Sequence, residues 1–263
     1  MSFETIEIER NYKVSTIWLN RPEIRNAFNE VMIAELIKAF KEEGEREDVR
    51  AIVLRGKGKV FCAGADLNWM RDVAQYGFEQ NYRESLQLSE CFYTIYHCPK
   101  PTLAVVHGAA MGGANGLLAA CDFAFCEKET IFSLSEVKIG IIPACISPYI
   151  IKRTGEFNAR DLMLTGRRIN GAEAESYHLI NKCFKDIHET EAHLQATIQL
   201  LFSSGPHAIA HCKNLIEEVV NKISLEEALT HSAKKIAEIR ASTEGQEGMT
   251  AFLEKRKPNW VDN

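Results

Sequence analysis

The strongest constraint on the fold of this chain is a repeated order of short β-type runs, turns and apolar helices. It is clearest in TLAVVHGAAMGGANGLLAACD, residues 102–122, where a run rich in β-branched residues leads through four glycines into an apolar helix. Looser strand-strand-helix units occur at 13–43 and 51–97. Short apolar runs bounded by turn residues are typical of buried strands, and their alternation with helices predicts an α/β fold. The recurrence of the unit favours a superhelical arrangement of this core.

The character of the chain changes near residue 190. Up to that point short strands alternate with helices, whereas beyond it we find four helical patterns and no convincing strand, at 189–202, 206–221, 224–241 and 245–255. We therefore predict an α/β core at 1–190 and an all-helical region at 191–263. One of these helices carries an apolar stripe, which either its own core or another subunit would cover: Leu215, Ile216, Val219, Val220 and Ile223.

The glycine run of the first segment can be compared with two phosphate-binding loops. The dinucleotide fingerprint G-x-G-x-x-G fits Gly113 and Gly116 but requires a glycine where Met111 stands. The P-loop pattern fits Gly108 and Gly113 but requires a lysine where Ala114 stands. Both loops are excluded. The glycines serve either close packing of strand and helix or close approach of a ligand to the backbone.

Charge and cysteine content narrow the class of protein. The 263 residues carry a net charge of −5, which argues against nucleic-acid binding, because such proteins present a strongly basic face. The eight cysteines are scattered without a C-x-x-C motif, so we expect reduced thiols. MSFETIEIER at the start lacks the order of a signal peptide, and no run suits a membrane span, so we expect a cytoplasmic protein. His207 and His211 have metal-like spacing without an accompanying carboxylate, and no metal site is expected.

Two turns rich in small residues could bind an oxygen atom through backbone N–H groups. They lie at 62–67 and 110–113, and each follows a strand and leads toward a helix. Small side chains let a ligand approach the backbone closely, and an N–H at a helix start carries positive dipole character. Two such N–H groups on one carbonyl oxygen would form an oxyanion hole.

A third feature is Glu136, in the segment IFSLSEVKIGIIP at 131–143. It follows a β-type run and precedes an apolar stretch. A carboxyl group in apolar surroundings has a raised pKa and can exchange protons near neutral pH. Taken in isolation, the residue is more typical of a surface glutamate at the end of a strand.

Four segments together resemble the crotonase (enoyl-CoA hydratase/isomerase) superfamily. They are FCAGADLNWM with the nearby RPEIRNAFN, HGAAMGGANGLLAACD, FSLSEVKIGIIPA, and EGQEGMTAFLEKRKPNW, and they occur in the order typical of that superfamily. The SEV-IGIIPA variant and the FLEKRKP-W ending are most similar to the bacterial 3-methylglutaconyl-CoA hydratase branch, which acts in the breakdown of leucine and acyclic terpenes.

The resemblance implies a fold and a chemistry. Repeated ββα turns would form a spiral core, and the helical C-terminal region would build homotrimers that pair into hexamers. The substrate would be an acyl-CoA thioester whose thioester oxygen is bound by two backbone N–H groups, which by motif belong to Ala65 and Gly113. The carboxylate that transfers protons carries over to Glu136. Coenzyme A would be part of the substrate, and no separate cofactor is expected.

The resemblance also implies residues that contact the CoA moiety. Backbone groups of the first small-residue turn would bind it, an arginine would lie near its phosphates, and the C-terminal helix would close over it. The residues carried over in this way are Arg25, Ala63, Asp66, Leu67, Phe252 and Lys255. The basic run at 255–257 would equally fit a solvated helix end.

One position departs from the two-glutamate hydratases of the superfamily. These carry a glutamate on the central helix, three residues after the oxyanion glycine, where this chain has Gly116. Three mechanisms are compatible with this glycine: hydration by Glu136 alone, hydration assisted by a substrate carboxylate for which Gly116 leaves room, and double-bond isomerisation by Glu136 between Cα and Cγ. The branch resemblance favours hydration. Asn115 and Ser135 could orient a water, but they are more typical of polar residues within a helix and a strand.

Three other classes of function compete with this one. A catalytically silent acyl-CoA-binding homologue is compatible with Gly116. RNA binding through the helix region 29–49 is disfavoured, because that region holds seven acidic and three basic residues. A serine hydrolase would need a G-x-S-x-G elbow, which the sequence lacks.

Overall fold

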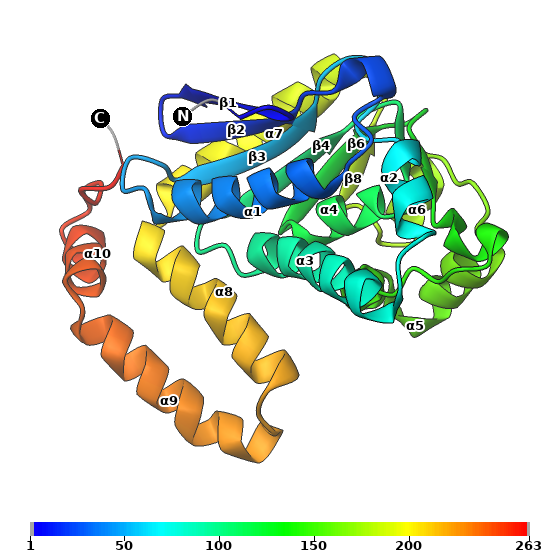
Figure 1. Ribbon diagram of the computed structural model, residues 1–263. Coiled ribbons are helices and arrows are strands. Elements are labelled where there is room, and N and C mark those ends of the chain that lie inside the picture. Colours follow the sequence, from blue (N-terminus) through cyan, green and yellow to red (C-terminus); the bar gives the residue numbers. More distant parts are fainter. Residues whose placement is uncertain (1–2, 262–263) are drawn as a thin grey trace. The chain divides into compact units, whose positions relative to one another are not determined.

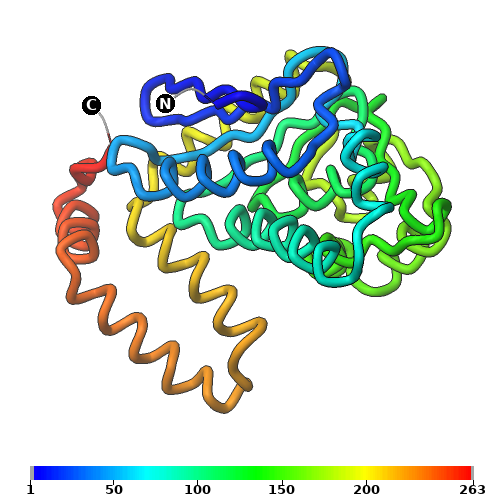
Figure 2. The backbone as a smooth tube through the Cα atoms, viewed as in Figure 1, coloured from blue at the N-terminus to red at the C-terminus, as the bar shows by residue number. Residues whose placement is uncertain are grey.

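The computed structural model describes residues 3–261, which form two compact units (Figure 1; Figure 2). The first unit comprises residues up to 98 together with 102–194, and the second comprises 99–101 and the residues from 195 onward. Among the described residues, no helix is both long enough and apolar enough to cross a membrane.

The first unit is built on a six-stranded sheet. Its strands lie in the order β1 (Ile6–Asn11), β2 (Val14–Leu19), β3 (Ala51–Gly56), β4 (Thr102–Val106), β6 (Phe123–Glu127) and β8 (Lys182–Phe184). β1 and β2 form an antiparallel hairpin, and the remaining neighbours pair in parallel. β4 is buried along its whole length, as expected for an inner parallel strand covered on both faces.

The first long helix of this unit begins at a side-chain cap. α1 (Glu30–Glu45) starts after Asn29, whose side chain accepts a hydrogen bond from the Met32 N–H at 3.1 Å. α1 lies beside α3 (Phe78–Tyr96) on one face of the sheet (Figure 1). α5 (Ser147–Thr165) consists of two helical arms, because the backbone leaves the helical conformation at Gly155. The shorter helical elements are η1 (Pro22–Ile24), α2 (Leu67–Val73), α4 (Ala114–Ala120), η2 (Ser135–Ile139) and α6 (Gly171–Ser176).

A small second sheet departs from the sequence analysis. The segment expected as a turn at 110–113 begins inside a strand, β5 (Ala109–Met111), which pairs in parallel with β7 (Ile131–Ser133). Isolated bridges extend this pairing from Ala110 to Cys62 and from Phe132 to Ile169. The small-residue turn, the glycine run and the strand that leads to Glu136 therefore lie side by side.

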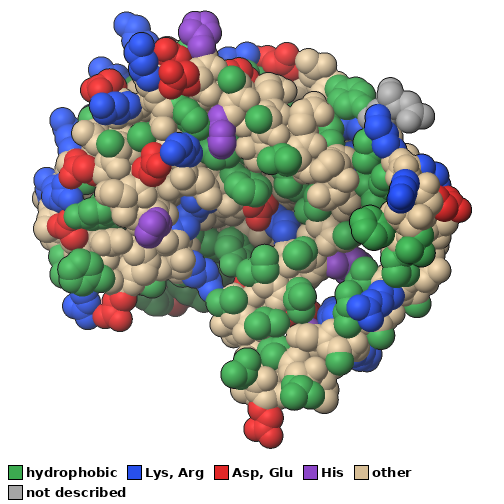
Figure 3. Space-filling view, turned by 180° about the vertical axis from the view of Figure 1, so that it is seen from behind, with side chains coloured by type: hydrophobic (Ala, Val, Ile, Leu, Met, Phe, Trp, Pro, Cys, Tyr) green, Lys and Arg blue, Asp and Glu red, His purple; other side chains and the backbone are tan. Residues whose placement is uncertain are grey.

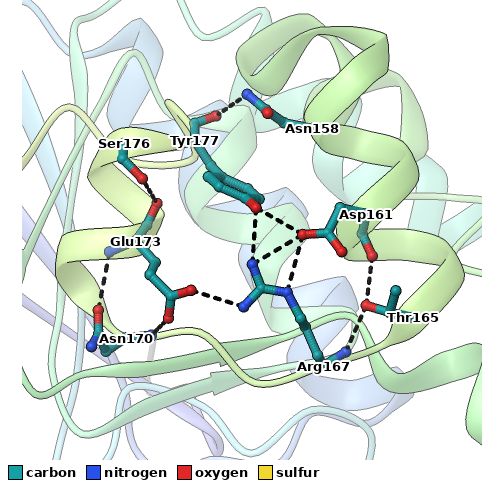
Figure 4. Close-up of polar contacts among 8 residues, drawn as sticks. All are labelled: Asn158, Asp161, Thr165, Arg167, Asn170, Glu173, Ser176 and Tyr177. Atoms are coloured by element: carbon teal, nitrogen blue, oxygen red, sulfur yellow. Dashed lines mark hydrogen bonds and ion pairs between the residues drawn. The ribbon is translucent and has the colours of Figure 1, made fainter.

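A polar network anchors the segment next to β7 (Figure 4). The Arg167 guanidinium donates to Asp161 at 3.0 Å, to Glu173 at 2.8 Å and to the Tyr177 hydroxyl at 2.9 Å. These ion pairs hold the pKa of the Asp161 and Glu173 carboxyl groups below their ordinary values. Ile169, two residues after Arg167, exchanges two backbone hydrogen bonds with Phe132 of β7. The network therefore also supports β7, the strand that leads into η2.

The second unit is helical in its described residues. It contains the later part of α7 (Ile187–Ser203), then α8 (Pro206–Asn221), α9 (Leu225–Ala241) and α10 (Thr243–Leu253). Apolar side chains stand exposed on these helices, including those of Ile216 (59%) and Val220 (69%) in the predicted stripe (Figure 3). The stripe is therefore not buried within its own chain. The predicted α/β core followed by a helical region is confirmed.

Candidate active site

The two small-residue turns meet edge to edge in the first unit. The Cys62 N–H donates to the Ala109 carbonyl and the Met111 N–H donates to the Cys62 carbonyl, both at 3.1 Å. On its other side the first turn pairs with Phe28, whose N–H donates to the Gly64 carbonyl at 2.9 Å. Backbone hydrogen bonds therefore fix the two turns against each other.

Glycine is required at two positions because the turns are so close. Gly64 has a φ of +94°, and a Cβ there would lie 2.8 Å from the Met111 carbonyl oxygen. A Cβ on Gly113 would lie 2.7 Å from the ring of Phe28. The buried Phe28 ring, which packs 6.0 Å from the ring of Trp69, therefore forms a wall beside the second turn.

Two backbone N–H groups of these turns are left to bind something other than the protein. The neighbouring N–H groups of Asp66 and Gly112 donate to the carbonyls of Phe28 and Ser133, at 2.9 and 2.8 Å. Within the described residues, the N–H groups of Ala65 and Gly113 have no acceptor. Both N–H groups lie at or just before the start of a short helix, where backbone donors lack an intrahelical acceptor, and both belong to the positions carried over as oxyanion donors.

Glu136 lies against the second turn. It is the second residue of η2, and its Oε1 lies 3.4 Å from the point that a Cβ on Gly112 would occupy. Its Oε2 is buried and has no hydrogen-bond partner among the described residues. Burial raises the pKa of Glu136 above the ordinary value for glutamate. The surface-glutamate alternative does not fit this burial.

This arrangement suits chemistry at a carbon next to a carbonyl group. Two N–H donors on one carbonyl oxygen would stabilise negative charge that develops there, and a buried carboxyl group beside them could move a proton to or from the adjacent carbon.

Comparison with known proteins identifies the family. The family model described as enoyl-CoA hydratase/isomerase matches residues 9–263. The chain belongs to the enoyl-CoA hydratase/isomerase family. It is 38% identical to an enoyl-CoA hydratase of known structure from Shewanella pealeana, with a TM-score of 0.94 and coverage of 98% of this chain and 96% of that one.

Two further relatives show the breadth of this family. The structure of Pseudomonas aeruginosa AtuE is 34% identical, with a TM-score of 0.94 and coverage of 98% of this chain and all of that one. The peroxisomal Delta(3,5)-Delta(2,4)-dienoyl-CoA isomerase of Arabidopsis thaliana is 30% identical over 276 residues, with coverage of 99% of this chain and 98% of that protein. The predicted crotonase fold and the predicted class of enzyme are thereby confirmed at the level of the family. The 3-methylglutaconyl-CoA hydratase branch stays a prediction.

Gly116 corrects one expectation for this enoyl-CoA hydratase/isomerase family member. A Cβ at this buried position would lie 2.4 Å from Cγ2 of Ile146 and 2.8 Å from the ring of Phe92. Both side chains belong to the core and are almost completely buried. The expectation that Gly116 leaves room for part of the substrate is therefore wrong, since apolar side chains already fill that space.

The residues expected to contact CoA at the first turn differ in their contacts and in their exposure to solvent. The Ala63 N–H donates to the Arg25 carbonyl at 2.9 Å, so the backbone of the exposed Arg25 lies beside the turn. Both carboxylate oxygens of Asp66 are engaged: one caps α2 through the Asn68 N–H at 2.8 Å, and the other pairs with Arg21 at 2.9 Å. Asp66 therefore holds the start of α2 in place, and its neighbour Leu67, 69% exposed, is available for contact.

Phe252 and Lys255 lie in the second unit. Phe252, in the last turn of α10, is 82% exposed, and the exposed Lys255 follows that helix in a left-handed conformation. The structure thus brings together the site residues of the first unit, whereas these two stay predictions.

A hollow of about 460 Å³ at the other end of α4 takes no part in this site. It is lined in part by Tyr96, Tyr149 and Arg153. The Arg153 guanidinium donates to the carbonyls of Ala119 and Cys121 at 3.0 and 2.7 Å, which satisfies the C-terminal end of the helix. Arg153 therefore has a structural role at the end of α4, and we assign no second binding site to this hollow.

Proposed function

We propose that this chain adds water across the α,β double bond of an enoyl-CoA thioester, with Glu136 as its acid–base residue. The observation that carries the proposal is the combination of two unpaired backbone donors with the unpaired Glu136 Oε2 next to the same turn. The donors bind the thioester oxygen, and the carboxyl group lies beside the carbons that react.

Glu136 performs both proton transfers in this mechanism. Its carboxylate removes a proton from water while the water oxygen forms a bond to Cβ, and the electron pair of the double bond moves to the thioester oxygen as an enolate. The N–H groups of Ala65 and Gly113 stabilise that oxygen. The protonated Glu136 then gives its proton to Cα as the carbonyl reforms. The product is the 3-hydroxyacyl-CoA, and the carboxylate is regenerated without a further cofactor.

For the acyl group we propose a branched or carboxylated chain, with 3-methylglutaconyl-CoA as the first candidate. Support comes from the SEV-IGIIPA and FLEKRKP-W segments. The packing around Gly116 means that a substrate carboxylate would be accommodated elsewhere in the site. A cytoplasmic homotrimer or hexamer is proposed alongside, and the exposed apolar side chains of the second unit are consistent with subunit contacts.

A product-mass assay tests the function. Purified protein is mixed with crotonyl-CoA, 3-methylcrotonyl-CoA and 3-methylglutaconyl-CoA, the enone absorbance is followed, and the products are weighed by mass spectrometry. We expect a gain of one water, fastest with 3-methylglutaconyl-CoA. Binding of all three thioesters without turnover would instead indicate a silent acyl-CoA-binding homologue.

Double-bond isomerisation is the second candidate. Phe92 and Ile146 occupy the space at Gly116, so Glu136 acts without a partner there, and a proton shuttle between Cα and Cγ requires one carboxylate. The similarity to the Arabidopsis dienoyl-CoA isomerase favours the same reading. A change of absorbance with unchanged product mass would establish this reaction.

A further inference from the structure

The Gly113 N–H belongs to a peptide unit that is flanked by glycine on both sides, and glycine restricts the orientation of a peptide unit least. The peptide unit between Gly112 and Gly113 has no Cβ on either side, and Gly112 has a φ of +54°. Glycine populates positive and negative φ about equally, so rotation of such a unit meets little intrinsic resistance. A donor that must aim at one point therefore needs an external constraint on its peptide plane.

Asn115 supplies that constraint. The Gly112 carbonyl oxygen accepts a hydrogen bond from the Asn115 backbone N–H at 3.0 Å and a second from the Asn115 Nδ2 at 2.9 Å. In a trans peptide the carbonyl oxygen and the next N–H point to opposite sides. Fixing the Gly112 oxygen on the Asn115 side therefore directs the Gly113 N–H away from it, where it lacks a protein acceptor.

The same side chain joins this peptide to the strands on either side. Nδ2 also lies 3.2 Å from the Ala110 carbonyl oxygen at the centre of β5 and 3.0 Å from the Ser133 carbonyl oxygen at the end of β7. Three carbonyl oxygens around one nitrogen define which end of the amide is the donor, since the reverse orientation would set oxygen against oxygen. Asn115 is completely buried, so no solvent competes for these bonds.

We propose that Asn115 is a positioning residue, which holds the Gly112–Gly113 peptide plane so that the Gly113 N–H faces the thioester oxygen. The proposal rests on the proposed function, because it assumes that this N–H binds that oxygen. The proposal extends that function, because it assigns the orientation of the Gly113 N–H to a side chain that does not contact the substrate.

Infrared difference spectroscopy of a bound thioester tests this assignment. The probe is butyryl-CoA labelled with ¹³C at the carbonyl, which has no double bond and is not hydrated. In the unaltered protein we expect the carbonyl stretching frequency to fall on binding. Asn115→Ala should lose at least half of that shift and up to about 100-fold in kcat, with a smaller change in KM, since the donor is misaimed rather than removed.

Two further variants separate positioning from mere stability. In Asn115→Ser the hydroxyl can still donate to the carbonyl three residues earlier, so it should retain more of the shift than the alanine variant. Asn158→Ala is the matched control, because Asn158 also donates its Nδ2 to a backbone carbonyl, that of Thr154 at 3.1 Å, on α5. We expect its spectrum to match that of the unaltered protein.

The outcomes are distinct. The spectrum arises from thioester bound to folded protein, so a loss of stability alone does not change it, and the serine variant substitutes if the alanine variant does not fold. A full shift in Asn115→Ala overturns the positioning role and leaves the proposed function intact. No shift in the unaltered protein overturns the oxyanion hole itself, and with it both proposals.

Discussion

Replacing Gly116, which lies in α4, by alanine would test whether core side chains fill the space next to this residue. The added Cβ would lie 2.4 Å from Cγ2 of Ile146 and 2.8 Å from the ring of Phe92, whereas carbon atoms in contact are normally about 3.5–4.0 Å apart. Ile146 and Phe92 are 2% and 0% exposed, so neither side chain can move into solvent. The substitution therefore forces a rearrangement within the core.

The expected magnitude follows from two opposing terms. Adding a methyl group to a well-packed core costs about 1–3 kcal/mol in the free energy of unfolding. Alanine in place of glycine inside a helix returns up to about 1 kcal/mol. Because the new atom overlaps two buried groups, we expect Gly116→Ala to lower the free energy of unfolding by about 1–2 kcal/mol.

A double-mutant cycle measured by urea unfolding checks this origin. Ile146→Ala removes Cγ2, the nearest obstacle, whereas the control Ile146→Val keeps it. In the alanine background the cost of Gly116→Ala should fall, because only the overlap with Phe92 remains, and in the valine background it should persist. If the effects of Gly116→Ala and Ile146→Ala on the free energy of unfolding were additive, the packing argument would be refuted and the space next to Gly116 would be open.

Four further predictions concern Glu136, Asp66 and the cysteines. Glu136→Gln should lower kcat by about 10²–10⁴-fold while acyl-CoA affinity, measured by calorimetry, stays largely intact; near-normal turnover would remove Glu136 from the mechanism. The same variant should unfold at a higher urea concentration than the unaltered protein at pH 7, because burial raises the pKa of Glu136, so the native state loses stability as pH rises from the ordinary glutamate value through the raised one; the difference should vanish in acid. Asp66→Ala removes the cap of α2 and should cost about 1–2 kcal/mol, with a smaller loss in Asp66→Asn; equal losses in urea melts would contradict the separate roles of its two oxygens. Burial raises the pKa of Cys62 to about 12, so a thiol reagent should label the exposed Cys212 first in the native protein, and early labelling of Cys62, located by peptide mapping, would contradict that burial.

Local signals in the sequence were sufficient for most of the fold. The hairpin, the Asn29 cap of α1 and the break in α5 each depend on residues that are neighbours in the chain, so short-range patterns predict them. The strand β5 was missed for the opposite reason. Its three residues have no strong β preference, and their pairing comes from contacts with Cys62 and with β7, which are distant in sequence.

The same distinction explains the site. The catalytic segments could be carried over because motifs mark Ala65, Gly113 and Glu136 in sequence. The occupants of the space at Gly116 could not, because Phe92 comes from α3 and Ile146 from the residue before α5, and nothing near Gly116 identifies them. A glycine in a sequence indicates that a side chain is missing, but packing decides whether the space stays open.

The glycine run can therefore be assigned both functions that its sequence left open, at different positions. Gly116 serves packing, since core side chains lie where its Cβ would be. Gly113 likewise serves packing, since its Cβ would overlap the buried ring of Phe28, whereas Gly112 leaves open the space beside Glu136, whose Oε1 would lie 3.4 Å from a Cβ there. Two successive glycines also make the peptide between them easy to rotate, and under the proposed function this is why Asn115 is needed to hold it. In that proposal, the Gly113 donor depends on a buried side chain that does not contact the substrate.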